Sequence, residues 1–412
     1  MAGAVTAAMA QPLTLEAVLA LADQPHPQLA AMEAQVRLAA AERLAAESAR
    51  DLRLTLEAAL RGGRNSLHHA YGPDHVARLN LRKPLWDGTR YEAGVQAARL
   101  EEAARGLQLA DARSQRRIRL MGRYFDVLLA DQQYAADTEA MAVAYVRWDD
   151  ARQRAELGEL AAAQLAELES AYHELRVRQR ASADRMREAR ARLAAEMGRP
   201  DELPAELAEP RLTGNDRPLP AFERLLALMQ AENPLLRMQR QRLAAGTRRI
   251  EAARAEQLPM LELEAEAAAY TRASSTRDNL RAGLNLSWPI HAGRLYDARL
   301  AREQAQLHAL QAEHEQLWLA LRQELLQTWH EIQHLREVER KAAEVEMQAR
   351  ELALERARAE YELELRTNLG TSMAQTQYAR LRQKAAEYRL ALAWERLAAL
   401  VGRPLDSLEG SP

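Results

Sequence analysis

The residues whose types and spacing could do chemistry form two small groups. The first is HEIQH, which places His330, Glu331 and His334 in one short stretch. In the H-E-x-x-H pattern, two histidines four apart share one helix face and hold zinc, while the glutamate acts as a base. Such a site also needs a third ligand and a cleft that excludes water. A zinc metallopeptidase is therefore a remote interpretation, and a chance motif on the wall of a helix is the simpler one.

The second group is a set of histidines in and beside the segment RGGRNSLHHAYGPD, namely His68, His69 and His75. Histidine is the commonest metal-binding side chain, but an exposed loop that happens to hold histidines explains the cluster more simply. No glycine-rich phosphate loop, nucleophile elbow or paired-carboxylate site is found in the sequence. We therefore expect no enzyme activity, no metal site and no cofactor.

Composition narrows the class of protein. The 412 residues are 48% hydrophobic but only 5% aromatic, which is typical of long helices and coiled coils. The 57 basic and 59 acidic residues give a formal charge of −2, so nucleic acid is not an expected partner. There is no cysteine. No apolar stretch reaches the roughly 18 to 20 residues of a membrane-spanning helix. Residues 1–10, MAGAVTAAMA, are either a clipped secretory signal or a disordered N-terminus.

The sequence indicates two copies of one unit, because four landmarks recur in the same order. The HPQL motif has its match in NPLL, LNLRKPLWDG in LNLSWPIHAG, and RLAAEMGRP in RLAALVGRP. One coincidence would mean little, but four at nearly constant spacing indicate duplication. The paired positions are Pro27 and Pro234, Gly88 and Gly293, Gly158 and Glu364, and Arg192 and Arg396, which lie 207, 205, 206 and 204 residues apart.

Each copy should fold in the same order. A helix comes first, Leu13 to about Ala49 and Ala221 to about Glu256. Two strands follow, and then a long helical hairpin closed by Gly-Arg-Pro, the expected helix stop. The 76 residues from Arg294 to Leu369 contain neither proline nor glycine. At about 1.5 Å per residue they predict a helix on the order of 110 Å long.

Four segments alternate apolar and polar residues, which puts the two sets on opposite faces of a sheet. They are residues 52–60, 76–83, 260–270 and 280–288. Each is roughly 9 to 11 residues long, enough for a tilted strand to cross a bilayer. A sheet half-buried against a helix of the same chain is the alternative. Trp86 and Trp288 end two of the strands, as interfacial aromatic residues do in barrels, although core-packing residues would give the same sequence.

The membrane interpretation requires several copies of the chain. Four strands cannot close, and an open edge in hydrocarbon leaves unpaired backbone groups at several kcal/mol each. Three copies would supply twelve strands.

The duplication, the paired strands ending in Pro-x-x-x-Gly, the long hairpins and the turn YELELRTNL resemble the TolC-like outer-membrane efflux proteins, the outer membrane factor family. PLTLEAVLALA…HPQL and LSWPIHAGR carry the resemblance best. It implies a mainly α fold with a small β part: four strands and long antiparallel helical hairpins in each chain. A homotrimer would form a 12-stranded transmembrane β-barrel continued by a periplasmic α-helical barrel.

The same resemblance implies partners and a location. The protein would lie in the outer membrane of a Gram-negative bacterium, in contact with lipid. It would passively conduct substrates delivered by an inner-membrane efflux pump through a periplasmic adaptor, in a tripartite efflux or type I secretion-like system. A soluble periplasmic coiled-coil adaptor or scaffold is the alternative, although an adaptor usually carries one hairpin rather than a duplicated unit.

The resemblance also assigns roles to residues. Family members close the periplasmic tip with a network of hydrogen bonds and ion pairs around the two helical turns. The candidates for the tip and gate are Gln164, Tyr361, Arg366, Glu364, Gly158 and Gly370. Glu156, Glu159 and Glu362 would give the entrance a negative potential, or they are solvated helix charges. The strand-to-helix turns are expected at Pro84 and Gly88 and at Pro289 and Gly293, where the proline stops the strand and the glycine turns the chain.

The expected division of the chain follows from these assignments. Residues 11–200 are the first repeat, with its tip near 158, and residues 220–404 are the second, with its tip near 364–370. Residues 201–219, which are rich in proline, link the two repeats, and residues 405–412 are a C-terminal tail.

Overall fold

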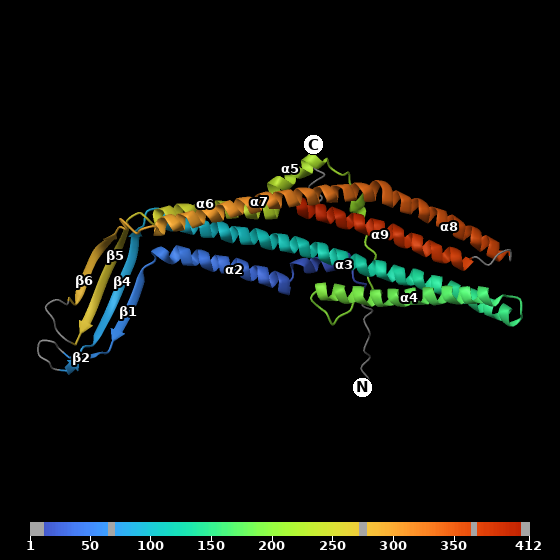
Figure 1. Ribbon diagram of the computed structural model, residues 1–412, viewed down its shortest axis with the longest axis horizontal. Helices are drawn as coiled ribbons and strands as arrows, with labels where there is room; N and C mark the ends of the chain where they lie inside the picture. The colour runs from blue at the N-terminus through green and yellow to red at the C-terminus, as the bar shows by residue number, and fades with distance from the viewer. Residues whose placement is uncertain (1–11, 65–70, 272–277, 364–368, 405–412) are drawn as a thin grey trace, which may run out of the picture. The chain divides into compact units, whose positions relative to one another are not determined.

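The computed structural model describes residues 12–64, 71–271, 278–363 and 369–404. Helices dominate, and a small antiparallel sheet completes the fold, as the sequence predicts (Figure 1). The elements of the first half are α1 (Leu15–Leu19), the 3-10 turn η1 (Ala20–Asp23), α2 (Pro27–Glu47), η2 (Ser48–Arg50), β1 (Arg53–Ala59), β2 (Gly62–Arg64), β3 (Tyr71–Pro73), β4 (Val76–Trp86), α3 (Arg90–Glu156) and α4 (Ala162–Glu196).

The second half follows the same order of helices, paired long strands and helical hairpin, without counterparts of η2, β2 and β3 among its described residues. Its elements are η3 (Thr213–Asp216), α5 (Phe222–Glu232), α6 (Pro234–Ala255), β5 (Met260–Tyr270), β6 (Leu280–Ser287), α7 (Leu295–His334), the π-helix η4 (Leu335–Glu339), α8 (Arg340–Glu362) and α9 (Leu369–Val401). None of the described helices combines the length and the hydropathy of a membrane span.

Two compact units divide the described chain. One consists of residues 12–29, 111–233 and 320–404, and the other of residues 30–110 and 234–319. Each unit takes segments from both halves of the sequence, and α2, α3 and α7 run through both. The boundaries of the two sequence repeats therefore do not coincide with those of the units, and they stay a prediction.

The opening helix of each half is broken, which corrects the expectation of a single helix. In the first half α1 and η1 end at Asp23, and α2 begins at Pro27. In the second half α5 and α6 are separated at Asn233, and α6 begins at Pro234. Proline lacks the backbone N–H that a helix interior needs, but it fits the first turn of a helix well. Each proline therefore starts a new helix.

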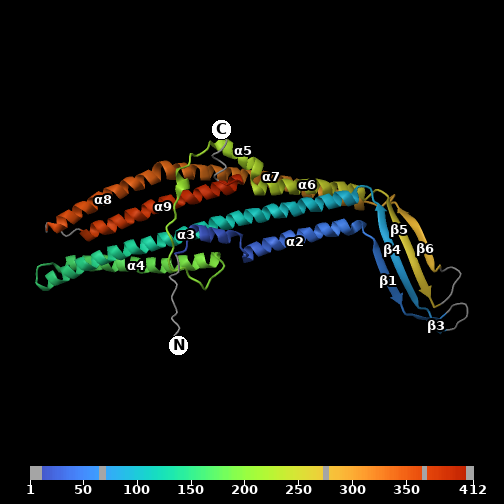
Figure 2. The same ribbon diagram turned by 180° about the vertical axis from the view of Figure 1, so that it is seen from behind.

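The four long strands form one antiparallel sheet in the order β1-β4-β5-β6 (Figures 1 and 2). Each half contributes a hairpin, and the central pairing of β4 with β5 joins the two hairpins. The strand ends that connect to α2, α3, α6 and α7 therefore all lie at one end of the sheet. At the other end, the short strands β2 and β3 form a separate hairpin.

The prolines of the two strand-to-helix turns behave differently from each other. In the second half β6 ends at Ser287, before Pro289, as predicted. In the first half β4 continues through Pro84 to Trp86, so this proline does not stop its strand. Pairing with β1 ends at Arg82, so Pro84 has a partner strand on one side only, where its missing N–H is tolerated. The register with β5 shifts between Pro84 and Trp86.

The expected turn glycines have positive φ angles, a conformation in which most L side chains are strained. They are Gly88, Gly158, Gly198, Gly293 and Gly402. At Gly88 a side chain would also clash, because its Cβ would lie 2.5 Å from Leu258 Cδ1.

A hydrophobic cluster fills the unit that contains residues 111–233. Leu15 and Val18 of α1 pack with Leu120 and Tyr124 of α3 and with Leu193 of α4. The rings of Phe125 on α3 and Tyr388 on α9 stack with their centroids 4.6 Å apart. The N-terminal helix, both hairpins and the inter-repeat segment therefore share one core.

Corresponding positions of the two halves make corresponding hydrogen bonds in this unit. The Tyr124 hydroxyl contacts the carbonyl of Leu13 at 2.8 Å, and the Trp329 indole N–H donates to the carbonyl of Pro220 at 3.0 Å. Tyr124 and Trp329 lie 205 residues apart, and Leu13 and Pro220 lie 207 apart. These separations match those of the sequence landmarks, as duplication would require. Burial raises the pKa of Tyr124 to about 12.

The long helix of the second half contains one residue more than its counterpart. The separation between landmarks rises from 205 at the turn glycines to 206 at the tips. Between these points α3 is unbroken, whereas η4 interrupts α7 and α8 with a π turn. A π turn accommodates an extra residue inside an α-helix. We attribute the change of spacing to an insertion absorbed at Leu335–Glu339.

This interpretation predicts that deleting Val338, an exposed residue of η4, yields a continuous α-helix with its flanking faces unchanged. The thermal unfolding midpoint should stay close to wild type. The control is deletion of Ala135, an exposed residue of the unbroken α3, which should rotate the rest of that helix by about 100° and displace its buried side. Equal losses of stability from the two deletions would refute the insertion.

Candidate functional site

One face of the four-stranded sheet is apolar and exposed. Cross-strand rows run over all four strands, and one joins Leu56, Leu79, Ala267 and Leu280. Leu56 and Leu280 are 72% and 75% exposed. The face is therefore not packed on a helix of the same chain within the described residues, which argues against the half-buried alternative. Soluble monomers rarely expose a contiguous apolar surface of this extent.

The opposite face of the sheet is charged, and its charges neutralise one another. Glu266 lies between two arginines of neighbouring strands, 3.0 Å from Arg281 and 4.0 Å from Arg78. Glu264 pairs with Arg82 at 3.3 Å. The two faces follow the predicted alternation, so a single sheet could separate an apolar from an aqueous environment.

The bulge in β4 changes the face on which Trp86 lies. Along β4 the even positions, such as Arg82 and Pro84, are on the charged face. After the bulge Trp86 pairs with Leu261, an apolar-face residue. Bulges commonly re-aim a side chain in this way. Trp288 extends the alternation of Leu286 beyond β6, and so both tryptophans lie at the helix end of the apolar face.

Ion pairs hold the helices together where they leave the sheet. The Glu256 carboxylate, at the end of α6, lies 2.6 Å from Arg299 of α7 and 3.5 Å from Arg90 of α3. Arg50 pairs with Asp87 at 2.5 Å and lies over the ring of Tyr91. The strand-to-helix turns are thereby fixed from two sides.

The predicted tip residues are only partly described. Glu364 and Arg366 lie outside the described residues, as do His68 and His69. Gly158 closes α3 with positive φ, and the Glu159 N–H donates to the Arg154 carbonyl at 2.9 Å. The Gln164 and Tyr361 side chains are exposed, and no contact between them is found among the described residues. The gate that these residues would form stays a prediction.

Gly370 contacts the other hairpin. A Cβ at this position would lie 2.8 Å from Cγ2 of Val143 on α3, so the first turn of α9 approaches α3 too closely for a side chain. The neighbouring Thr371 hydroxyl accepts a hydrogen bond from Arg147 of α3. These contacts attach the second hairpin to the first near the helical turns.

Farther along the same helices lies a polar network that the sequence interpretation missed. Asp137 of α3 is 1% exposed and accepts hydrogen bonds from Tyr378 of α9 at 2.7 Å and from Gln133 at 3.0 Å. Burial, and then the bond to Asp137, raise the pKa of Tyr378. One signal in the sequence could have revealed this polar network: Asp137 falls in a row of alanines at seven-residue spacing, Ala130, Ala144 and Ala151.

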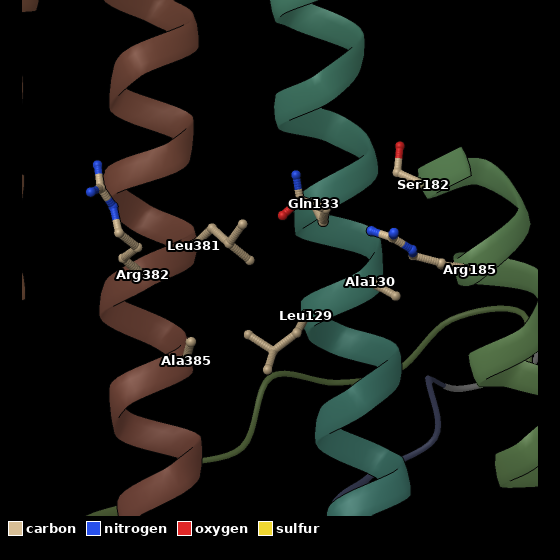
Figure 3. A pocket seen from close by; sticks show the side chains of 8 residues that line it. All are labelled: Leu129, Ala130, Gln133, Ser182, Arg185, Leu381, Arg382 and Ala385. Atoms are coloured by element: carbon tan, nitrogen blue, oxygen red, sulfur yellow. The ribbon is translucent and has the colours of Figure 1, made fainter. Parts of the chain in front are cut away.

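Two cavities lie between α3, α4 and α9. The first, of about 380 Å³, is shown in Figure 3, where Leu381 of α9 and Leu129 of α3 point toward each other. Gln133 of α3 and Arg185 of α4 line its polar side. The second, of about 270 Å³, is lined by Val143, Leu168, Tyr378 and neighbouring residues. Both follow the seams between helices.

The histidines of HEIQH do not converge on a site. His330 and His334 are exposed, and Glu331 pairs with Arg396 of α9 at 3.6 Å. His334 lies 3.3 Å from Glu339. Among the described residues there is no cluster of three histidine, cysteine, aspartate or glutamate side chains that could hold a metal ion. The zinc-peptidase alternative gains no support here.

Residues 225–403 match the family model described as "Outer membrane efflux protein". These residues are an outer membrane efflux protein domain. The family expected from the sequence is thereby confirmed, and its description places the chain at the outer membrane. No curated protein sequence matches the chain.

Solved structures of outer membrane proteins share the fold over nearly the whole chain. CusC matches with a TM-score of 0.77 at 17% identity, covering 95% of this chain and 92% of that one. The CmeC outer membrane channel of Campylobacter jejuni matches with 0.77 at 13%, covering 94% and 85%. The outer membrane protein VceC of Vibrio cholerae matches with 0.75 at 18%, covering 95% and 96%. The expected fold class is confirmed by these matches.

The efflux family and the fold favour a channel over the soluble adaptor or scaffold. The exposed apolar face of the sheet also favours a channel, because a soluble adaptor would have to cover that face.

The buried network predicts a measurable contribution of Tyr378 to stability. Tyr378→Phe leaves the Asp137 carboxylate without one of its two donors, which should lower the free energy of unfolding by about 1 to 3 kcal/mol. The control Tyr361→Phe alters an exposed hydroxyl of α8 and should change it by less than about 0.5 kcal/mol. Thermal or urea unfolding at neutral pH measures both. Similar small effects would mean that the Asp137 bond is not stabilising.

Proposed function

We propose that three copies of this chain form a passive outer-membrane channel that conducts substrates out of the periplasm. The observation that carries the proposal is the four-stranded sheet, with one exposed apolar face, one charged face and, in the described parts of the chain, two unpaired edges. The family of residues 225–403 supports an efflux role. No catalytic step and no cofactor enter the proposal.

The length of the sheet fits a membrane. β5 has 11 residues, and the intervals between them, at about 3.4 Å each, place its first and last residues roughly 34 Å apart. A tilt of about 40° shortens the height to roughly 26 Å, close to the roughly 25 Å apolar band of outer-membrane barrels. Trp86 and Trp288 at the helix end of the apolar face, with Lys83 nearby, suit the boundary between hydrocarbon and water.

The strand edges favour the oligomer. β1 and β6 are the outer strands of the sheet, and each pairs with one neighbour only among the described residues. Pairing β1 of one copy with β6 of the next satisfies both edges, and the ring closes without an unpaired backbone group. Eight strands is about the smallest closed barrel, so one copy with four strands cannot close. Among the possible oligomers we propose the trimer of twelve strands, which the resemblance to the efflux family implies.

The helices would then project into the periplasm from the turns at Gly88 and Gly293. There they would meet a periplasmic adaptor and, through it, an inner-membrane pump, as in a tripartite efflux or type I secretion-like system. The tip would be gated by the candidates named above: Gln164, Tyr361, Arg366, Glu364, Gly158 and Gly370. The contacts of α9 with α3 at Gly370 and Thr371 would hold the two hairpins of each copy together near this tip.

The two faces of one strand provide the sharpest test. Leu56→Asp places a carboxylate on the apolar face of β1, where the lipid would be, and a charge in hydrocarbon costs a few kcal/mol. We expect this variant to lose trimer assembly in detergent and channel conductance in planar bilayers.

The matched control is Thr55→Asp, the neighbouring residue on the charged face. It should assemble and conduct nearly as wild type does. If Leu56→Asp also assembled and conducted normally, or if the wild-type chain stayed monomeric without detergent, the channel proposal would fail.

A further inference from the structure

His26 lies between two helices of the first half, α2 and α4. Its Nδ1 accepts a hydrogen bond from the backbone N–H of Gln28, in the first turn of α2, at 3.3 Å. The backbone of Ala195, in the last turn of α4, is a second hydrogen-bonding partner of the ring. The ring edge also packs on Gly198, whose Cβ would lie 3.8 Å from His26 Cδ2. We call this contact the first joint.

Asn233 occupies the corresponding place in the second half, directly before Pro234. Its side-chain N–H₂ donates to the carbonyl of Leu400, in the last turn of α9, at 2.8 Å. Asn233 is buried and also packs against the glycine of its helix stop, Gly402. We call this contact the second joint. The two joints have the same construction, but an amide does not titrate and an imidazole does.

We propose that the first joint is pH-sensitive and loosens when His26 is protonated, whereas the second joint does not respond to pH. Protonated imidazole has two N–H donors and no acceptor. Nδ1 would then lose its bond to the Gln28 N–H, and a positive charge would stand at the N-terminus of α2, where the helix dipole opposes it.

Two arginines that face His26 make its protonation less favourable still. Arg116 of α3 is completely buried and donates to the carbonyls of Ala22 and Gln24, beside the ring. Arg119, also on α3, donates to Gln28 and pairs with Glu196 of α4 at 3.1 Å. Glu196 is the acidic group facing His26 and is already engaged by Arg119. Burial lowers the pKa of Arg116, and the negative charge of Asp23, in η1, acts in the opposite sense.

The direction of the pH effect follows from these neighbours. Burial first, and then Arg116, lower the pKa of His26, while Glu196 and the bond to Ala195 act in the opposite sense with less effect. A depressed pKa in the folded state means that the group stabilises the fold above its unfolded value of about 6.5. This stability is lost as the pH falls through the folded pKa. The first joint should therefore open in mildly acidic solution.

Hydrogen–deuterium exchange of the full-length protein in detergent micelles tests the proposal. Exchange is compared at about pH 7.5 and about pH 5.5, spanning the range in which an imidazole titrates, after correction for intrinsic rates. Peptides covering residues 20–30 and 190–200 should lose protection at the lower pH, because protonated His26 opens the first joint locally. Peptides covering residues 228–238 and 396–403 should show no such loss.

Two variants assign the effect to its residue. His26→Asn copies the second joint into the first and should abolish the pH-dependent loss of protection. The control His173→Asn removes an exposed histidine of α4 and should leave that loss intact. The proposal is overturned if the wild-type peptides keep their protection at low pH, or if they lose it equally in His26→Asn. Neither result depends on conductance, so the channel proposal is tested separately.

Discussion

An unpaired backbone N–H or C=O costs several kcal/mol in hydrocarbon, and this cost governs how the sheet can be used. The interior strands β4 and β5 satisfy each other, but within the part of the chain that the structure describes β1 and β6 each keep one open edge. The apolar face adds a second constraint, because exposed leucines such as Leu56 need a nonpolar environment. Water would satisfy the strand edges but not the apolar face, whereas lipid together with further copies of the chain would meet both constraints.

The helical part follows from a unit used twice. Corresponding residues fix corresponding segments: Tyr124 and Trp329 hold the entry segments. Asn233 bonds to the end of α9, and His26 packs on Gly198 after α4. The two copies of the unit also differ in local structure. The second contains the π turn η4 and a buried asparagine, and the first has an unbroken α3 and a titratable histidine. The duplicated framework thus has two hairpins with different local properties.

Much of this fold can be predicted from the sequence, because its determinants are local. Alternation over ten residues located the strands, and glycines such as Gly88 located the turns. The failures have long-range causes. Pro84 does not stop its strand because the pairing of β4 with β1 ends at Arg82, which no local pattern records. The Asp137–Tyr378 bond joins residues 241 positions apart, so only the alanine row hinted at it. The gate candidates Glu364 and Arg366 stay predictions.

The central claim is that one face of the sheet meets lipid and the other meets water, and β5 offers the most direct measurement. The chain has no cysteine, so each single substitution by cysteine along residues 261–266 introduces one thiol. In proteoliposomes, a membrane-impermeant, water-soluble thiol reagent should label positions 262, 264 and 266 and leave 261, 263 and 265 unlabelled. Uniform labelling, or the opposite alternation, would contradict the account.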